Sequence, residues 1–340
     1  MAVIIGIDPH KLLHAAYAID EHEQEVGHLE VRADARQCDR LLEWAGEFTG
    51  RSWAIESASG LGALLAQQLV NAGEHVVDVP ATLSSRVRLL GTGWSNKNDT
   101  NDARAVAVAA LRAPTLAGVR VEDHTTVLRL LAKSHLDLGR SRSQACSRLH
   151  ALVRELIPGG IRKEVVVSQA ETVLAGIEAT TSVQAQRLEL AWETLDDIRR
   201  FDTKQKRSKQ RISDAVTAAD TTLLDIYGVG PIIAATLIGY SGDVRRFPTA
   251  GHYAAYNGTA PIEVSSAGRT VHRLSRRGSR ALNHVIHMAA VTQIRHADTE
   301  GRRYYDTKVA AGKTKREALR ALKRKLSDRV YRALLVDSKQ

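Results

Sequence analysis

The chain has 340 residues, of which 44% are hydrophobic and 25% charged, a composition typical of a soluble protein with two or three domains. Its apolar runs, such as Val3–Ile7 and Ile232–Ile238, are too short to cross a bilayer, so we expect no membrane partner. Cys38 and Cys146 lie far apart and form no metal-ligand pattern, which is consistent with a cytoplasmic location.

The net charge of +10 is unevenly distributed along the chain. Residues 301–340 contain 13 Lys and Arg but 4 Asp and Glu, whereas residues 1–120 contain 11 and 15. This basic tail predicts a polyanionic partner such as nucleic acid, although a solvated charged helix explains the tail equally well. The aromatic content of 4% argues against base stacking as the main way of holding a single strand.

The first 122 residues have the pattern of an α/β domain. Three short strand-like runs, of which the first is rich in β-branched residues, follow one another closely, which favours an antiparallel meander, and helices then alternate with strands. This is the order of elements in ribonuclease-H-like (RuvC-like) domains. We expect strands over 3–8, 13–19, 26–31, 53–56 and 75–79, with helices over 35–48 and 61–72.

The rest of the chain is predicted to be helical. Residues 123–220 contain apolar positions at helical spacing, such as Leu188, Leu195 and Ile198, and a break at 158–160. We interpret this stretch as a helical hairpin or coiled-coil arm for spacing or oligomerisation. Residues 221–340 are expected to form a small all-α domain.

Four carboxylates are candidate metal ligands. Asp8 and Glu56 each end an apolar strand, where a carboxylate has no structural role. Asp99 and Asp102 precede a helix expected over 105–111, and their spacing of three places them on one helical face. Hard oxygen ligands select Mg²⁺ or Mn²⁺, and two such ions can promote in-line cleavage of a phosphodiester. Each acid alone fits a turn or helix cap as well.

Gly228 and Gly230 form a Gly-x-Gly turn that opens the apolar helix 232–238. Backbone N–H groups at such a helix start can hold a DNA phosphate, as in a helix-hairpin-helix motif. A plain tight turn is the alternative.

A loop over 258–269 contains two serines, Ser265 and Ser266, close to several arginines. An arginine side chain can bind two phosphate oxygens at once and keeps its charge. These arginines could therefore surround a phosphate that a serine attacks. Ser275 is expected to be the N-cap of a helix that runs to about residue 295. The arginines expected to bind nucleic acid are Arg269, Arg273, Arg276, Arg277 and Arg280.

These motifs, in this order and over essentially the whole chain, closely resemble the DEDD-type transposases of the IS110 insertion-sequence family, which are bridge-RNA-guided recombinases. The N-terminal motifs are found at Gly6–Lys11, Ala54–Ser57 and Lys97–Ala103. The C-terminal motifs are found at Gly228–Pro231, Gly242–Phe247, Asn257–Pro261 and Ser275–Arg280.

The resemblance implies a RuvC-like first domain with Asp8, Glu56, Asp99 and Asp102 as metal-binding acids, and a catalytic serine in the C-terminal domain. The family's serine directly precedes a glycine, but here Ala267 separates Ser266 from Gly268. The number of residues that follow Pro261 favours Ser266 as the catalytic serine, and Ser265 is the alternative. The resemblance also implies a guide RNA encoded by the element.

We therefore expect a transposase that cuts and rejoins donor and target DNA as a homodimer or homotetramer. One alternative is an endonuclease like the Holliday-junction resolvases, in which the acids hydrolyse DNA and the serine is idle. The other is a DNA-binding protein without catalytic activity.

Overall fold

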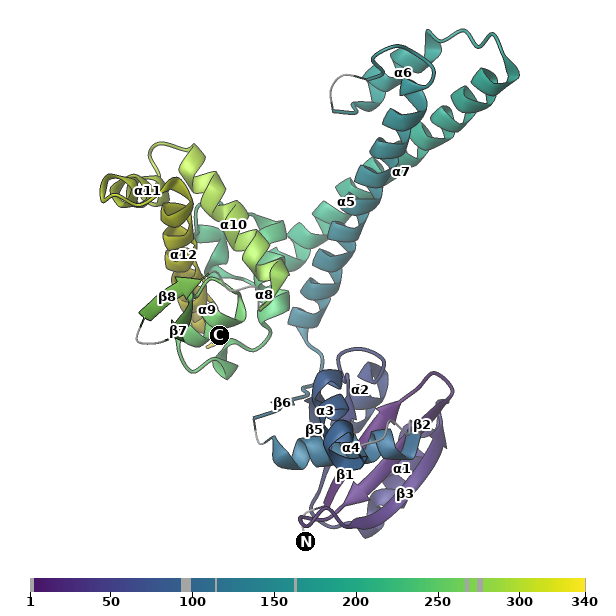
Figure 1. Cartoon of the computed structure of the whole chain (residues 1–340), viewed down its shortest axis with the longest axis vertical. Helices are drawn as coiled ribbons and strands as arrows, with labels where there is room; N and C mark the ends of the chain where they lie inside the picture. Colours follow the sequence, from purple (N-terminus) through teal and green to yellow (C-terminus); the bar gives the residue numbers. More distant parts are fainter. Residues whose placement is uncertain are drawn as a thin grey trace. The chain divides into compact units, whose positions relative to one another are not determined.

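The computed structural model describes residues 3–92, 99–113, 115–161, 164–266, 269–273 and 278–339. The chain divides into two compact units, Met1–Glu122 and Asp123–Gln340, which we describe separately (Figure 1). In the described part of the chain, none of the helices is both long and apolar enough to span a membrane.

The N-terminal unit is built on a six-stranded mixed sheet with the strand order β3-β2-β1-β4-β5-β6. Strands β1, β2 and β3 form an antiparallel meander, and β4 and β5 then continue the sheet parallel to β1. This topology confirms the ribonuclease-H-like order expected from the sequence. The strands are β1 (Val3–Pro9), β2 (Leu13–Ile19), β3 (Glu25–Arg32), β4 (Arg51–Glu56), β5 (Val76–Val79) and β6 (Ala117–Gly118).

Helices cover both faces of this sheet. On one face, α1 and α2 pack against alternate residues of β1 such as Ile5 and Ile7. On the other face, α4 packs small residues such as Ala103 and Ala107 against β2. The helices of this unit are α1 (Gln37–Trp44), the 3-10 turn η1 (Ala45–Glu47), α2 (Ala63–Asn71), α3 (Ala81–Thr92) and α4 (Asp99–Arg112).

In the second unit, two long helices form the predicted hairpin. The helices α5 (His124–Arg154) and α7 (Ser182–Ala218) run side by side, and α6 (Val167–Ala175) packs at the far end of the hairpin (Figure 1). The apolar positions predicted from helical spacing lie in this seam, because Leu195 and Ile198 are fully buried.

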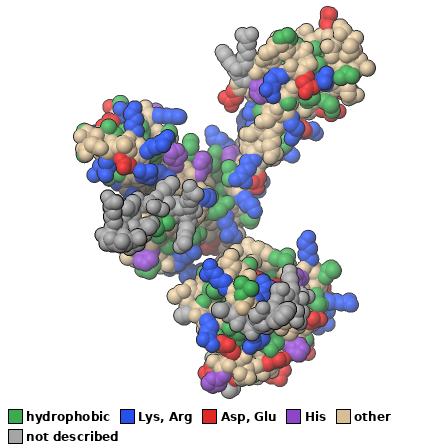
Figure 2. Space-filling model, in the orientation of Figure 1, with side chains coloured by type: hydrophobic (Ala, Val, Ile, Leu, Met, Phe, Trp, Pro, Cys, Tyr) green, Lys and Arg blue, Asp and Glu red, His purple; other side chains and the backbone are tan. Residues whose placement is uncertain are grey.

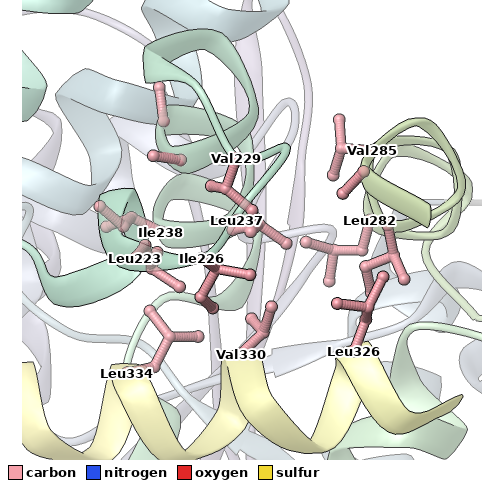
Figure 3. Packing of buried hydrophobic residues seen from close by; sticks show 14 of the residues in the cluster. Leu223, Ile226, Val229, Leu237, Ile238, Leu282, Val285, Leu326, Val330 and Leu334 are labelled. Carbon is pink, nitrogen blue, oxygen red and sulfur yellow. The ribbon is translucent and has the colours of Figure 1, made fainter. Parts of the chain in front are cut away.

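The rest of this unit surrounds α8, an apolar helix whose interior residues are buried on nearly all sides. Figure 3 shows Leu237 and Ile238 of α8 packed with Leu282 of α10 and Val330 of α12. The base of the helical hairpin formed by α5 and α7 contributes Ile212 to this core. The elements are η2 (Thr222–Asp225), α8 (Pro231–Ser241), η3 (Val244–Arg246), α9 (Ala250–Tyr256), β7 (Ile262–Ser266), β8 (Arg269–Arg273), α10 (Arg280–Arg295), α11 (Glu300–Ala310) and α12 (Lys315–Asp337).

Two local predictions need correction. The N-cap of α10 is Ser279, whose side chain accepts a hydrogen bond from the N–H of Leu282, so the assignment of this role to Ser275 is wrong. The two acids expected just before a helix instead lie inside α4, because this helix already begins at Asp99.

Candidate active site

Three of the four predicted acids converge at one end of the N-terminal sheet. Strands β1 and β4 are parallel neighbours, with Ile7 opposite Ile55, so the next residues, Asp8 and Glu56, lie side by side near the ends of adjacent strands. Asp102 lies on α4, which packs on the same strands. The side chains of Asp8 and Asp102 are buried, at 6% and 4% exposure.

The three carboxylates act on one another electrostatically. Burial raises the pKa of Asp8 to about 7, and the charges of Glu56 and Asp102 add to this increase. A hydrogen bond between Asp8 and Glu56 also contributes, and His10, whose Nε2 is 3.8 Å from Asp8 Oδ2, lowers the pKa. Such a buried group of acids favours either a shared proton or a bound cation.

The backbone of β4 is strained directly after Glu56. Ser57 has a φ of 52°, a left-handed conformation that residues with a β-carbon rarely adopt. Hydrogen bonds fix this turn, since the N–H of Ser57 donates to the carbonyl of Val79 at 2.9 Å and that of Ala58 to Asp78 Oδ1 at 2.8 Å. The strained turn holds Glu56 at the end of its strand.

The serine-bearing loop is a β-hairpin in the C-terminal unit. Strands β7 and β8 pair antiparallel, and Ser265 and Ser266 stand opposite Thr270 and Arg269 at its tip. Outside the β-hairpin, the flanking segments are joined by a hydrogen bond, in which the N–H of Ser279 donates to the carbonyl of Tyr256 at 2.7 Å.

The arginines predicted around the serines are only partly described. Arg269 and Arg273 belong to β8, Arg280 begins α10 and is exposed, and Arg276 and Arg277 lie outside the described residues.

The predicted Gly-x-Gly turn opens α8 as expected. Gly230 is the N-cap and is exposed, and Pro231 occupies the first helical position. Gly228 has a φ of +84°, and a β-carbon there would approach the carbonyl oxygen of Ala289 on α10 to 3.0 Å. Gly228 therefore has a packing role, and phosphate binding at this turn stays a prediction.

Two family models match the chain. A model for the DEDD transposases of the IS110 type matches residues 5–158, and the model of the transposase IS116/IS110/IS902 family matches residues 220–306. The chain belongs to the IS110 family of transposases.

Curated relatives match this transposase over most of their length. An uncharacterised 44.8 kDa protein of insertion element IS116 from Streptomyces clavuligerus is 26% identical, with 98% of this chain and 95% of the relative covered. A probable family 20 transposase from Pseudomonas aeruginosa is 27% identical, with 83% and 81% covered. An uncharacterised 43.6 kDa protein of IS110 from Streptomyces coelicolor is 26% identical, with 95% and 92% covered.

Among solved structures, the transposase is similar to Thermus thermophilus RuvC in complex with a Holliday junction substrate. The TM-score is 0.28 and the identity 16%, over 35% of this chain and 100% of RuvC.

Two residues of the acidic site were missed in the sequence, and both lie on α3 of the transposase. Ser84 Oγ donates to Glu56 Oε1 at 2.6 Å, and Arg88 Nη1 donates to Asp102 Oδ1 at 2.5 Å. The hydrogen bond to Asp102 raises the pKa of Arg88, and the charges of Asp102, Glu56 and Asp8 raise it further. The spacing of four between Ser84 and Arg88 puts both on one helical face, which is the signal that the sequence offered.

In the described residues, His, Cys, Asp and Glu side chains nowhere form a group of three or more that could hold a metal ion as it stands. Arg88 takes one oxygen of Asp102, and the side chain of Asp99 lies outside the described part. The acids nevertheless fit a divalent cation in chemistry, because they are hard oxygen donors that repel one another. A cation would have to displace Arg88 from Asp102.

Arg88→Met is therefore expected to tighten Mn²⁺ binding. The ion pair joins the partly exposed Arg88 to the buried Asp102, and a charged contact of this kind contributes on the order of 1 kcal/mol, so the dissociation constant should fall by about fivefold. Calorimetric titration of Mn²⁺ measures this, and Arg86→Met, an exposed change on the same helix, is the control. Unchanged or weaker Mn²⁺ binding by Arg88→Met would contradict competition between Arg88 and the cation.

Proposed function

We propose that this transposase cuts and rejoins DNA with a serine nucleophile and a divalent cation, guided by an RNA that its element encodes. The observation that carries the proposal is the convergence of Asp8, Glu56 and Asp102 at the end of a ribonuclease-H-like sheet. The family assignment and the position of Ser266 at a hairpin tip support it. The guide RNA and a dimeric or tetrameric assembly rest on the family resemblance alone.

Asp8, Glu56, Asp99 and Asp102 are the proposed ligands of Mg²⁺ or Mn²⁺. The cation, when bound, supplies positive charge to the phosphate oxygens on which negative charge develops. Asp8 must lose its proton to act as a ligand, so we expect cation affinity to increase as the pH rises toward and past 7.

Ser266 is the proposed nucleophile. Its Oγ forms a bond to phosphorus as the bond from phosphorus to one sugar oxygen breaks; the hydroxyl proton leaves to a base, and the departing oxygen takes up a proton. The new ester bond between Ser266 and phosphorus conserves the energy of the bond that was broken, so attack by a sugar hydroxyl can rejoin the strand and release the serine. Arginines of the hairpin region would neutralise the charge of the transition state.

Ser266→Ala is expected to abolish the covalent protein–DNA adduct and to leave DNA binding unchanged, because only the attacking oxygen is removed. Denaturing electrophoresis with labelled element-end DNA and Mg²⁺ detects the adduct. Ser265→Ala is the matched control and should keep the adduct. If the adduct survives in Ser266→Ala and disappears in Ser265→Ala, the nucleophile is Ser265.

A second candidate function is hydrolytic cleavage of DNA by the acids alone. The interruption of the family's Ser-Gly pair by Ala267 favours it. In that case the unmutated protein cuts DNA with Mg²⁺ and forms no adduct in the same experiment.

A further inference from the structure

Four basic side chains gather where α10 packs against α12. Arg280, His284 and His287 follow one another at helical spacing on a single face of α10. Lys323 reaches this face from α12, where its Nζ donates to Oδ1 of Asn283 at 2.7 Å. Figure 2 shows Lys and Arg side chains, in blue, gathered over the α11–α12 end of this unit.

These basic groups stand close enough to repel one another. Burial lowers the pKa of the half-buried Lys323, and Arg280 lowers it further. Burial also lowers the pKa of His287, and Lys323 and His284 add to the effect. Half-burying the charge of Lys323 close to Arg280 costs free energy, and a bound anion would offset that cost.

The cluster lies at the foot of the serine hairpin. Asn283, the partner of Lys323, donates from Nδ2 to the carbonyls of Asn257 and Gly258, both at 3.0 Å. The chain enters β7 at Ile262, four residues after Gly258. Ser266 is four residues further, so up to eight extended residues, or about 26 Å, separate it from Gly258, which corresponds to about eight base pairs of B-form DNA. A phosphate at the cluster would therefore lie within about eight base pairs of the attacked phosphate.

We propose that Arg280, His284, His287 and Lys323 form a binding site for a DNA backbone phosphate within about eight base pairs of the bond that the serine attacks. The inference rests on the proposed function for its choice of DNA. Lys323 offers a point charge held by Asn283, and Arg280 and the imidazoles offer further N–H donors, which is the donor set that phosphate oxygens accept. Contacts of this kind do not depend on the DNA sequence, and they fix the position of the duplex on the protein.

The proposal is tested by measuring the affinity of the full chain for a labelled duplex of random sequence, without divalent metal. Lys323→Met should weaken binding by about tenfold, since a charge-assisted contact is lost. The slope of log affinity against log salt should become shallower by about 0.9. His287→Gln should weaken binding less, and Lys323→Arg, which keeps the charge, should retain most of the affinity.

Arg295→Met is the matched control, because it removes one exposed positive charge from the other end of α10. It should leave affinity and salt slope unchanged. A circular dichroism spectrum like that of the unmutated protein shows that Lys323→Met is folded. If Lys323→Met does not fold, the binding measured for His287→Gln is the test. Unchanged binding by Lys323→Met and His287→Gln, equal losses in Arg295→Met, or a loss seen only with duplex RNA would each overturn the proposal.

The readout separates this site from the catalytic proposal. Weaker DNA binding by Lys323→Met together with no serine adduct in the unmutated protein supports the phosphate site and contradicts the serine mechanism. A serine adduct with unchanged binding by Lys323→Met gives the opposite result.

Discussion

Asp8→Asn is expected to abolish strand cleavage and, at the same time, to stabilise the metal-free protein. The amide keeps the shape of the side chain but removes the charge that would hold a cation. Changes to residues that only support metal ligands already cost about 10- to 100-fold in activity, so losing a ligand should reduce the cleavage rate by more than about 100-fold. Stability should increase because the cost of burying the Asp8 charge disappears, together with its repulsion by Glu56 and Asp102.

The stabilisation should depend on pH. The pKa of Asp8 is about 7 in the folded protein, against 3.8 for the ordinary side chain, so the folded state binds more protons between these values. The free energy of unfolding of the metal-free protein should therefore fall as the pH rises from about 4 to about 7. Asp8→Asn removes this decrease, and its melting temperature at pH 8 should exceed that of the unmutated protein by a few degrees.

Thermal unfolding at several pH values, with and without Mg²⁺, measures both effects. Mg²⁺ should stabilise the unmutated protein at pH 8 and leave Asp8→Asn unaffected. Asp39→Asn, the same chemical change at an exposed position of α1, should behave like the unmutated protein. Cleavage at the normal rate by Asp8→Asn, or a lower melting temperature at pH 8, would rule out this assignment of the acidic site.

The carboxylates at the strand ends could be predicted because their signal is local. Asp8 and Glu56 each close a run of buried β residues, and the parallel pairing of such runs brings their ends together. Asp102 was also selected as a candidate, since its spacing from Asp99 fits one helical face. The start of α4 was placed too late, because Asp99–Asp102 has the composition of a cap rather than of a helix.

Site residues whose contacts depend on the packing of one helix against another were not predicted from the sequence. Arg88 reaches Asp102 only because α3 packs against α4, and helix α3 was not predicted at all. The β-hairpin of β7 and β8 was predicted to be a loop because of its serines and glycine. Its apolar residues Ile262, Val264 and Val271 nevertheless alternate with polar residues, as they do in strands. Lys323 and Asn283 are 40 positions apart, and their contact depends on how α10 and α12 pack.

The contact between β1 and α4 depends on a single glycine, and Gly6→Ala is expected to separate the acids. A β-carbon on Gly6 would come within 2.3 Å of the carbonyl oxygen of Ala103 and 2.4 Å of the nitrogen of Ala107. Both are backbone atoms of α4, so a side-chain rotation cannot relieve the clash. The helix that carries Asp102 must move away from Asp8, which shares β1 with Gly6.

We expect Gly6→Ala to lower the free energy of unfolding by about 3 kcal/mol, at the upper end for overpacked cores, and to lose cleavage and Mn²⁺ binding together. Denaturant unfolding and calorimetric titration measure the two losses. Gly46→Ala, where a β-carbon meets nothing within 4 Å, should leave both unchanged. Adding Ala107→Gly to Gly6→Ala should restore little, because the two closest contacts are with backbone atoms. Native stability of Gly6→Ala, or full rescue by Ala107→Gly, would mean that α4 does not lie directly on β1 at this point.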